Sequence, residues 1–212
     1  MKIKSAIFDL DGTLLDTMRA WRNLGETYLE QKGVVYEKGL KQVLEKMTLE
    51  ESAEYFREKY KISDSAEKIV SDINGIIRDF YYYDAKLKEG AYDFLHILKE
   101  NDVKICLATA SGEELSKAAL KQNGVLELFD AFLFSCNKRE SEIYEKAASL
   151  ISANKEECVV FEDALHAVKS AQKAGFKVCG VYEKLIRPRK RVAEISDFYI
   201  KSFKEAENLF TF

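Results

Sequence analysis

The sequence predicts a protein of the α/β class: a doubly wound parallel sheet, with a Rossmann-like core and an inserted helical domain. Short apolar segments recur along the chain, helical patterns separate most of them, and one long segment shows helical periodicity alone. Continuously apolar strands are typical of parallel sheets that helices cover on both faces. With 212 residues, the chain is long enough to bury a substantial core.

Five segments are predicted as strands because each is short, largely apolar and bounded by polar or turn-forming residues. They are Lys4–Phe8, Lys104–Thr109, Ala131–Ser135, Cys158–Phe161 and Lys177–Val181. Strands that alternate with helices form right-handed crossover units, which build a doubly wound sheet.

Helical periodicity fills the gaps between the last four strands, and a further helical pattern precedes the second strand. The predicted helices are Asp93–Glu100, Glu113–Asn123, Arg139–Ile151 and Leu165–Ala174. Gly175 follows the last of them as a stop signal, because glycine adopts the left-handed conformation that ends many helices.

The segment from Thr17 to about Asp84 differs from the rest, because it contains three apolar stripes at helical spacing and no convincing strand. Such stripes are more often the core of a helical bundle than a ligand site. A helical block inserted after the first strand suggests a separate cap domain. The expected division is a catalytic core of residues 1–16 and 85–212 and a helical cap of residues 17–84.

Composition narrows the class of protein further. Apolar residues make up 47% of the chain, charged residues 33%, and the net charge is −3, which argues against broad attraction to nucleic acid. No apolar run is long enough for a membrane span, and the N-terminus lacks a signal-peptide layout. The four cysteines include no Cys-x-x-Cys pair and suggest buried thiols in a reducing environment. We expect a cytoplasmic protein, a monomer or a weak homodimer, with no nucleic-acid or membrane partner.

Asp9 and Asp11 are the most informative residues of the chain. They follow the first strand, with one apolar residue between them, and Gly12 and Thr13 come next. On an extended chain, residues two apart share a face, so both carboxylates are expected to point the same way. Two carboxylates so close to each other repel, and a divalent cation bound between them would relieve the repulsion. Cations bound in this way often serve phosphoryl chemistry. A turn at Asp-Gly or a helix cap would explain one of these acids but not both.

Polar residues also follow the second and third strands. The hydroxyl of Thr109 is followed by small residues and a predicted helix start, where backbone N–H groups could bind a phosphate. The competing explanation for this segment is helix capping by Ser111. After the third strand, Lys138 offers a cation that could hold a phosphoryl group, although loop lysines are usually solvated.

A second acidic pair, Glu162 and Asp163, ends the fourth strand. Ligands of open parallel sheets bind at the carboxyl ends of the strands, so this pair is expected to meet Asp9 and Asp11 there. Burial would penalise such acids without a cation. Capping of the next helix by Asp163 is a competing explanation, but it does not account for acidic pairs on two strands.

The order of an acid pair, a hydroxyl, a lysine and a second acid pair resembles the haloacid dehalogenase-like superfamily of phosphohydrolases. The four motifs are Asp9-Leu-Asp11-Gly-Thr, Thr109, Lys138 and Glu162-Asp163. The helical insertion is similar to that of subfamily I, the beta-phosphoglucomutase-like and phosphoglycolate phosphatase-like members. The sequence departs from the family pattern in the third motif, which usually reads Gly-Lys-Pro and here reads Asn137-Lys138-Arg139. It departs again at Ala167, where the relatives usually carry glycine.

The resemblance implies a magnesium-dependent phosphatase with an aspartyl-phosphate intermediate. Asp9 would be the nucleophile, Asp11 the general acid and base, and Lys138 the residue that orients Asp9. The implied phosphate-binding residues are Gly12, Thr109, Ala110 and Lys138. The implied Mg²⁺ ligands are Asp9, the backbone carbonyl of Asp11, Glu162 and Asp163, with Glu162 in direct contact or one shell removed.

Three alternatives stay open at this point. A hexose-phosphate mutase would usually place a histidine shortly after Asp16-Thr17, where this chain has none. A phospho-aspartate regulator combines similar residues but needs no cap. Nucleic-acid binding through the basic run Arg187–Arg191 has the least support, because such runs are usually solvated loops.

The substrate is expected to be a small phosphorylated metabolite. Arg19 and Trp21 are candidate substrate contacts in the cap, although Trp21 could equally belong to the cap core.

Overall fold

The computed structural model describes residues 1–185 and 189–212. Clustering of contacts divides the chain into two compact units. The core unit comprises Met1–Thr17 and Ala85–Phe212, and the helical unit comprises Met18–Asp84. The expected boundary therefore differs at Thr17, whose hydroxyl donates to Asp11 within the core unit (2.8 Å).

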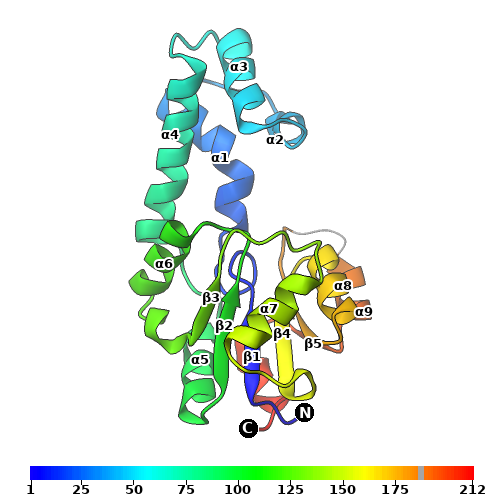
Figure 1. The fold of residues 1–212 in the computed structure, drawn as a ribbon. Helices are drawn as coiled ribbons and strands as arrows, with labels where there is room; N and C mark the ends of the chain where they lie inside the picture. Colours follow the sequence, from blue (N-terminus) through cyan, green and yellow to red (C-terminus); the bar gives the residue numbers. More distant parts are fainter. Residues whose placement is uncertain (186–188) are drawn as a thin grey trace. The chain divides into compact units, whose positions relative to one another are not determined.

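The core unit is built on a parallel sheet, which confirms the predicted fold class (Figure 1). Among the described residues the sheet has six strands in the order β3-β2-β1-β4-β5-β6. The strands are β1 (Ser5–Phe8), β2 (Lys104–Ala108), β3 (Ala131–Leu133), β4 (Cys158–Glu162), β5 (Lys177–Val181) and β6 (Phe198–Ile200). All five predicted strands are present, and β5 has the predicted bounds.

The sixth strand and the helix before it were missed by the sequence analysis. β6 has only three residues and lies at the sheet edge beside β5. A segment that short carries too little periodicity to predict a strand. Its pairing becomes evident only once β5 is in place.

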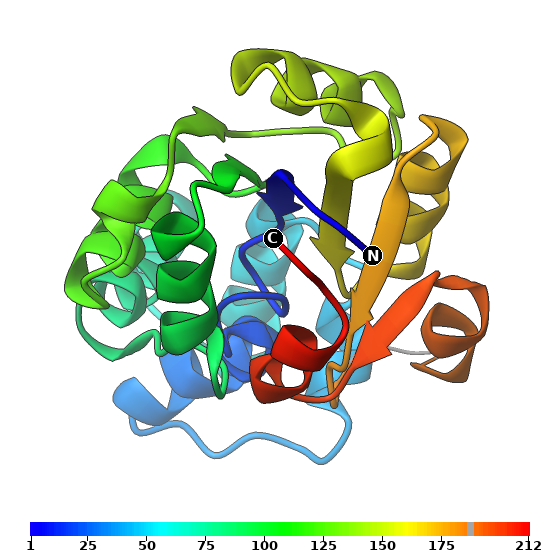
Figure 2. The same cartoon turned by 90° about the horizontal axis from the view of Figure 1, so that it is seen from below.

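Helices cover both faces of the sheet, as Figure 2 shows from below. Those of the core unit are α5 (Ala91–Glu100), α6 (Glu113–Gln122), α7 (Glu142–Leu150), α8 (Leu165–Lys173) and α9 (Arg189–Ile195), with short helical turns η2 (Leu126–Leu128), η3 (Lys155–Glu157) and η4 (Phe203–Asn208). Residues of α7, α8 and α9 pack on one face against Ile7 and Val160. On the opposite face Phe8 stacks on Phe161, with ring centroids 4.4 Å apart.

The helical unit consists of helices and turns, as its periodicity predicts. Between Met18 and Asp84, all of which the structure describes, there is no strand. It contains α1 (Met18–Gln31), α2 (Leu40–Leu44), α3 (Leu49–Tyr60), α4 (Ala66–Asp79) and the π-helical turn η1 (Phe80–Asp84). Its own core includes Tyr28, Phe56 and Ile69. A capping box of Thr48 and Glu51 begins α3 and satisfies two backbone N–H groups.

The four cysteines are free thiols, and Cys106, Cys158 and Cys179 are buried. Burial raises the pKa of Cys106 to about 12 and that of Cys158 to about 11.

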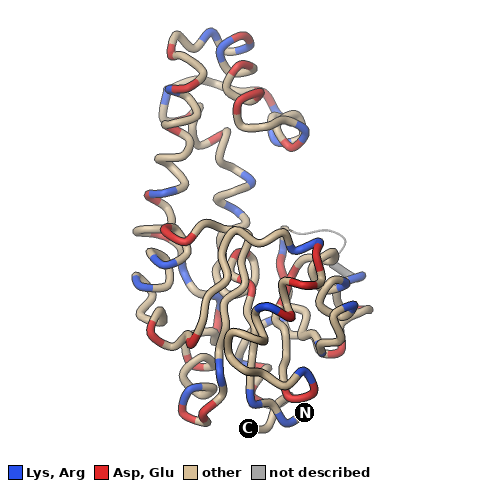
Figure 3. The backbone as a smooth tube through the Cα atoms, in the orientation of Figure 1, with Lys and Arg blue, Asp and Glu red and all other residues tan. Residues whose placement is uncertain are grey.

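Lysine and arginine are interspersed with acidic residues along both units (Figure 3). The basic run Arg187–Arg191 begins outside the described residues. No helix among the residues searched is both long and apolar enough to span a membrane.

Candidate active site

The chain leaves β1 through a tight turn that places Asp9 at the carboxyl edge of the sheet. The Asp9 N–H still donates to Phe161 of β4 (3.1 Å). Leu14 N–H then donates to the Leu10 carbonyl, and Gly12 N–H to the Leu15 carbonyl, each at 2.9 Å. Gly12 has φ +80°, a conformation that favours glycine. Gly12 is one of the residues expected to bind phosphate, and its N–H is used within the turn.

Thr13, which lies within this turn, is a buried residue for which the sequence analysis proposed no role. Its side chain is fully buried. The hydroxyl lies 3.0 Å from Asp9 Oδ2 and 3.3 Å from Asp163 Oδ1, so it is placed to donate to either carboxylate. No pattern in the sequence points to this contact, because Thr13 meets Asp9 only through the turn between them.

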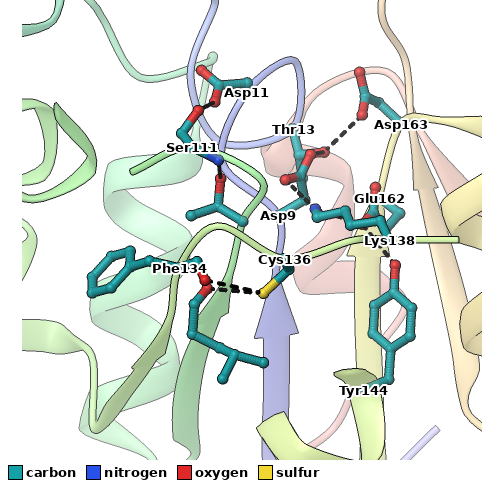
Figure 4. A network of polar contacts seen from close by, with 12 residues as sticks. Asp9, Asp11, Thr13, Ser111, Phe134, Cys136, Lys138, Tyr144, Glu162 and Asp163 are labelled. Carbon is teal, nitrogen blue, oxygen red and sulfur yellow. Dashed lines mark hydrogen bonds and ion pairs between the residues drawn. The ribbon is translucent and has the colours of Figure 1, made fainter. Parts of the chain in front are cut away.

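Lys138 lies between two carboxylates. Its ammonium contacts Asp9 Oδ1 and donates to Glu162 Oε1 (2.7 Å), as Figure 4 shows. Burial by itself would lower the pKa of Lys138, but the charges of Asp9 and Glu162 outweigh it and raise this pKa above its usual range. Lys138 is therefore a permanent cation in this site. Lys138 and Asp9 are thus in direct contact, as the resemblance implies.

Glu162 and Asp163 are both buried where β4 ends. The Tyr144 hydroxyl on α7 donates to Glu162 Oε1 (2.9 Å), a contact that the sequence did not reveal. Burial raises the pKa of Glu162 to about 7, against the opposing effect of Lys138. Burial and the charges of Asp9 and Glu162 raise the pKa of Asp163 well above its usual range. For both groups burial is the largest cause, because it disfavours the charged form of a carboxylic acid.

The same acids fit a divalent cation. One carboxylate oxygen from each of Asp9, Glu162 and Asp163 lies within 4.8 Å of the others. Among the described residues, Glu162 Oε2 and Asp163 Oδ2 are buried without a hydrogen-bond partner. Carboxylate oxygens are the ligands that hard divalent cations prefer, and a cation would satisfy both orphaned atoms. The expected backbone contribution of Asp11 stays a prediction.

The side chain of Asp11 contacts a different set of residues. Its Oδ2 accepts from Ser111 Oγ (2.5 Å) and its Oδ1 from Thr17 Oγ1 (2.8 Å). Figure 4 shows Asp11 beside Ser111, while Asp9 faces Thr13 and Lys138. The period-two pattern does not continue to Asp11, because β1 ends at Phe8 and the turn follows. The hydroxyl groups that donate to Asp11 therefore come from other residues than the Thr13 hydroxyl beside Asp9.

The segment after β2 carries the predicted phosphate-binding hydroxyl. Thr109 is buried, and its Oγ1 accepts from Ser111 N–H (3.0 Å). Ala110 is exposed beside it. The expectation that Ser111 caps the next helix is wrong: Gly112 is the N-cap of α6, without a side-chain cap, and the Ser111 hydroxyl donates to Asp11 instead.

The two candidate substrate contacts of the insertion, Arg19 and Trp21, lie on α1 of the helical unit. Both side chains are exposed, Trp21 with 40% of its surface accessible. The Trp21 indole donates to the Tyr81 hydroxyl (3.0 Å), so the residue is anchored at one end. A contact of either residue with substrate stays a prediction.

A doubly wound sheet with a lysine among buried carboxylates at its carboxyl edge defines a class of α/β enzymes suited to phosphoryl chemistry. The model of the haloacid dehalogenase-like hydrolases matches residues 6–181 of this chain. The chain therefore belongs to the haloacid dehalogenase-like hydrolase family, which confirms the resemblance drawn from the four motifs.

Individual relatives agree with this assignment. The chain is 30% identical over 143 residues to a probable pseudouridine-5′-phosphatase of Drosophila melanogaster, covering 67% of this chain and 61% of the fly protein. It is 25% identical over 201 residues to a phosphorylated carbohydrates phosphatase of Thermotoga maritima, covering 86% and 87% of the two chains. The crystal structure of a putative beta-phosphoglucomutase from Thermotoga maritima shares the fold, with a TM-score of 0.84 at 24% identity and 98% coverage of each chain.

Proposed function

We propose that the protein is a magnesium-dependent phosphatase that hydrolyses a small phosphorylated metabolite through an aspartyl-phosphate intermediate. The observation that carries this proposal is the position of Asp9. Its carboxylate lies at the carboxyl edge of the sheet, in contact with Lys138 and Thr13 and next to Glu162 and Asp163. Family membership supports the same reaction class.

Asp9, Glu162 and Asp163 would hold Mg²⁺, together with the backbone carbonyl of Asp11. When bound, the ion supplies positive charge to the carboxylates and to the phosphoryl oxygens. Lys138 contributes a second cation from the protein itself and fixes the Asp9 carboxylate through a direct contact. Asp9 is thereby oriented, as a carboxylate nucleophile requires.

In the first step, a carboxylate oxygen of Asp9 forms a bond to phosphorus while the bond from phosphorus to the ester oxygen breaks. Asp11 donates its proton to that departing oxygen. In the second step, Asp11 takes a proton from a water molecule whose oxygen attacks phosphorus. The bond between Asp9 and phosphorus breaks, and inorganic phosphate leaves. Thr109, the Ala110 N–H and Lys138 bind the phosphoryl oxygens throughout.

The helical unit would act as a cap that contributes substrate specificity and excludes water during the first step. Arg19 and Trp21 are its proposed substrate contacts. The relatives act on a pseudouridine phosphate and on phosphorylated carbohydrates, according to their names. We infer that the substrate is a phosphate monoester of a sugar or of a sugar-containing compound.

A hexose-phosphate mutase is the second candidate, and the likeness to a structure described as a beta-phosphoglucomutase concerns the fold alone. The only histidines of the chain are His96 and His166, both outside the segment that would form the cap. Plain hydrolysis needs no such histidine, and we favour it for this reason.

The decisive experiment is a panel of sugar, glycerol and nucleoside monophosphates, assayed for inorganic phosphate with Mg²⁺ and with a chelator. We expect Mg²⁺-dependent release that Asp9→Asn abolishes, because an amide oxygen cannot form the aspartyl-phosphate. Asp16→Asn is the matched control, since Asp16 is exposed in the same segment. Turnover by Asp9→Asn would refute the mechanism. An isomerised sugar phosphate without phosphate release would favour the mutase.

A further inference from the structure

The carboxylate of Asp11 is held by two hydroxyl groups, one on each oxygen. Ser111 Oγ donates to Oδ2 at 2.5 Å and Thr17 Oγ1 donates to Oδ1 at 2.8 Å. All three residues belong to the core unit. A carboxylate with both oxygens engaged has a defined orientation, because rotating it would break both hydrogen bonds.

The backbone of Ser111 is itself fixed from two directions. Its N–H donates to Thr109 Oγ1 (3.0 Å), and its carbonyl accepts from Ser135 N–H (3.1 Å). The Ser111 hydroxyl therefore projects from a rigid support that also contains Thr109. One short segment thus connects the proposed phosphate-binding hydroxyl of Thr109 with the proposed proton donor Asp11, although the two residues follow different strands, β2 and β1.

We propose that Ser111 is a positioning residue for Asp11: its hydroxyl holds the Asp11 carboxylate on the Thr109 side of the site, where the departing oxygen of a bound ester is expected. This inference rests on the proposed phosphatase function and assigns no chemical step to Ser111. The proton passes from Asp11 to the departing oxygen, and Ser111 keeps its own proton. Removal of the hydroxyl takes away the hydrogen bond to Asp11 Oδ2 and leaves the one that Thr17 donates to Oδ1.

The proposal has a signature that a structural or phosphate-binding role would not produce. An alkyl ester releases a poor leaving group that needs a proton from Asp11. The p-nitrophenolate ion spreads its charge over the ring and departs without that proton. Misplacing Asp11 should therefore slow the first step for alkyl esters and spare it for p-nitrophenyl phosphate. Weaker phosphate binding would affect both esters alike.

The test uses Ser111→Ala in the full-length protein with Mg²⁺. For the alkyl ester that the wild-type protein hydrolyses fastest, we expect kcat to fall by about tenfold or more with KM changed less than about twofold. The pre-steady-state burst of p-nitrophenol from p-nitrophenyl phosphate should keep its rate. Ser111→Thr, which retains a hydroxyl, should restore most of the lost kcat.

Two further variants make the assignment specific. In an Asp11→Asn background, Ser111→Ala should cause no additional loss, because the group it positions is already gone. Ser116→Ala removes a nearby hydroxyl that donates to the Gly112 carbonyl rather than to Asp11, and it should leave kcat unchanged. Thermal unfolding of each variant verifies that the fold is retained.

The outcomes separate this inference from the proposed function. If the wild-type protein releases phosphate from neither ester with Mg²⁺, the proposed function fails. If the wild-type protein is active but Ser111→Ala slows the burst of p-nitrophenol as much as it slows the alkyl ester, or slows neither, the positioning role of Ser111 is refuted. An additive loss in the Asp11→Asn background would refute it as well.

Discussion

Tyr144 shows how a single residue outside the sequence motifs can prepare a metal site, because it acts through Glu162. Lys138 and Tyr144 both donate to Glu162 Oε1, at 2.7 and 2.9 Å. The other oxygen, Oε2, is buried and has no hydrogen-bond partner in the described part of the chain. Two donors on one oxygen orient the carboxylate so that the second oxygen stays available for a cation. Partners of this kind tune metal affinity although they do not touch the metal.

Tyr144→Phe should therefore weaken metal binding. We expect the Mg²⁺ concentration that gives half-maximal phosphatase activity to rise about tenfold, because Glu162 loses one of the two donors that orient it. The measurement is a Mg²⁺ titration of activity, with the Mg²⁺-dependent rise in Tm as a second readout.

Tyr28→Phe is the matched control. Tyr28 is equally buried, but its hydroxyl has no hydrogen-bond partner among the residues described, and the residue belongs to the core of the helical unit. Its substitution should leave the Mg²⁺ titration unchanged. Equal Mg²⁺ dependence of Tyr144→Phe and the wild-type protein would contradict the role given to Tyr144.

At the scale of elements, two aspartates link the short edge strands β3 and β6 to the neighbouring strands of the sheet. Asp130 precedes β3 and accepts from Ile105 N–H of β2 (2.8 Å), while Asp197 precedes β6 and accepts from Val178 N–H of β5 (3.0 Å). Each also pairs with a lysine of the neighbouring strand. Strands of three residues have few ladder hydrogen bonds, so these side-chain contacts help to define where the edges pair.

Asp130→Ala should lower the free energy of unfolding at pH 7 by about 1–3 kcal/mol, because the Ile105 N–H loses its partner. Burial opposes ionisation of Asp130, but the Ile105 N–H and two lysines outweigh it and lower its pKa below the usual value. The contribution is thus present above the unfolded-state pKa of about 3.9 and is lost as the pH falls through the lower folded-state pKa.

The measurement is urea unfolding of wild-type protein and variant between pH 7 and pH 3, where the difference should shrink at the acidic end. Glu127→Ala removes an exposed carboxylate from the preceding turn and serves as the control. A difference for Asp130→Ala that is no larger than for this control would refute the anchoring role.

At the scale of the whole molecule, the groups proposed for catalysis belong to the core unit, whereas the helical unit has a core of its own. The two chain segments that bound the insertion also pair with each other inside the core unit. Asp16 N–H donates to the Lys86 carbonyl (3.0 Å), and Lys88 N–H to the Leu14 carbonyl (2.8 Å). The points where the helical unit leaves and rejoins the core unit are thus held together independently of that unit.

Replacing residues 18–84 by a short Gly-Ser linker should therefore leave a folded core unit. We expect a cooperative thermal transition and a rise in Tm on addition of Mg²⁺, because Asp9, Glu162 and Asp163 are all retained. Circular dichroism measures both. Hydrolysis of the preferred metabolite should fall much more than that of p-nitrophenyl phosphate, since the proposed specificity contacts are removed.

Asp163→Asn in the shortened protein is the control for the metal effect and should abolish the Mg²⁺-dependent rise in Tm. A shortened protein that lacks a cooperative transition would show that the core unit depends on the helical unit for folding.

How far the sequence could predict the fold depended on the length and periodicity of each element. β5 was predicted with its observed bounds because its apolar run lies between polar residues. β6 and α9 were not predicted, because such short elements contain too few residues to show a periodicity. At the site, the acidic pairs, Thr109 and Lys138 could be found because polar residues at strand ends are conspicuous. Thr13, Tyr144 and the link between Ser111 and Asp11 could not be found, because their partners are distant in sequence or across a turn.

The sequence by itself determined the doubly wound sheet, the helical insertion and the family, since periodicity and the spacing of charged residues encode them directly. Only the tertiary structure decided which oxygen of each carboxylate is occupied. Asp9 contacts Lys138 and Thr13, Asp11 accepts from Ser111 and Thr17, and Glu162 keeps one buried oxygen without a partner among the described residues. Such pairings depend on where the turn after Phe8 redirects the backbone, and periodicity along a strand does not extend beyond the strand's end.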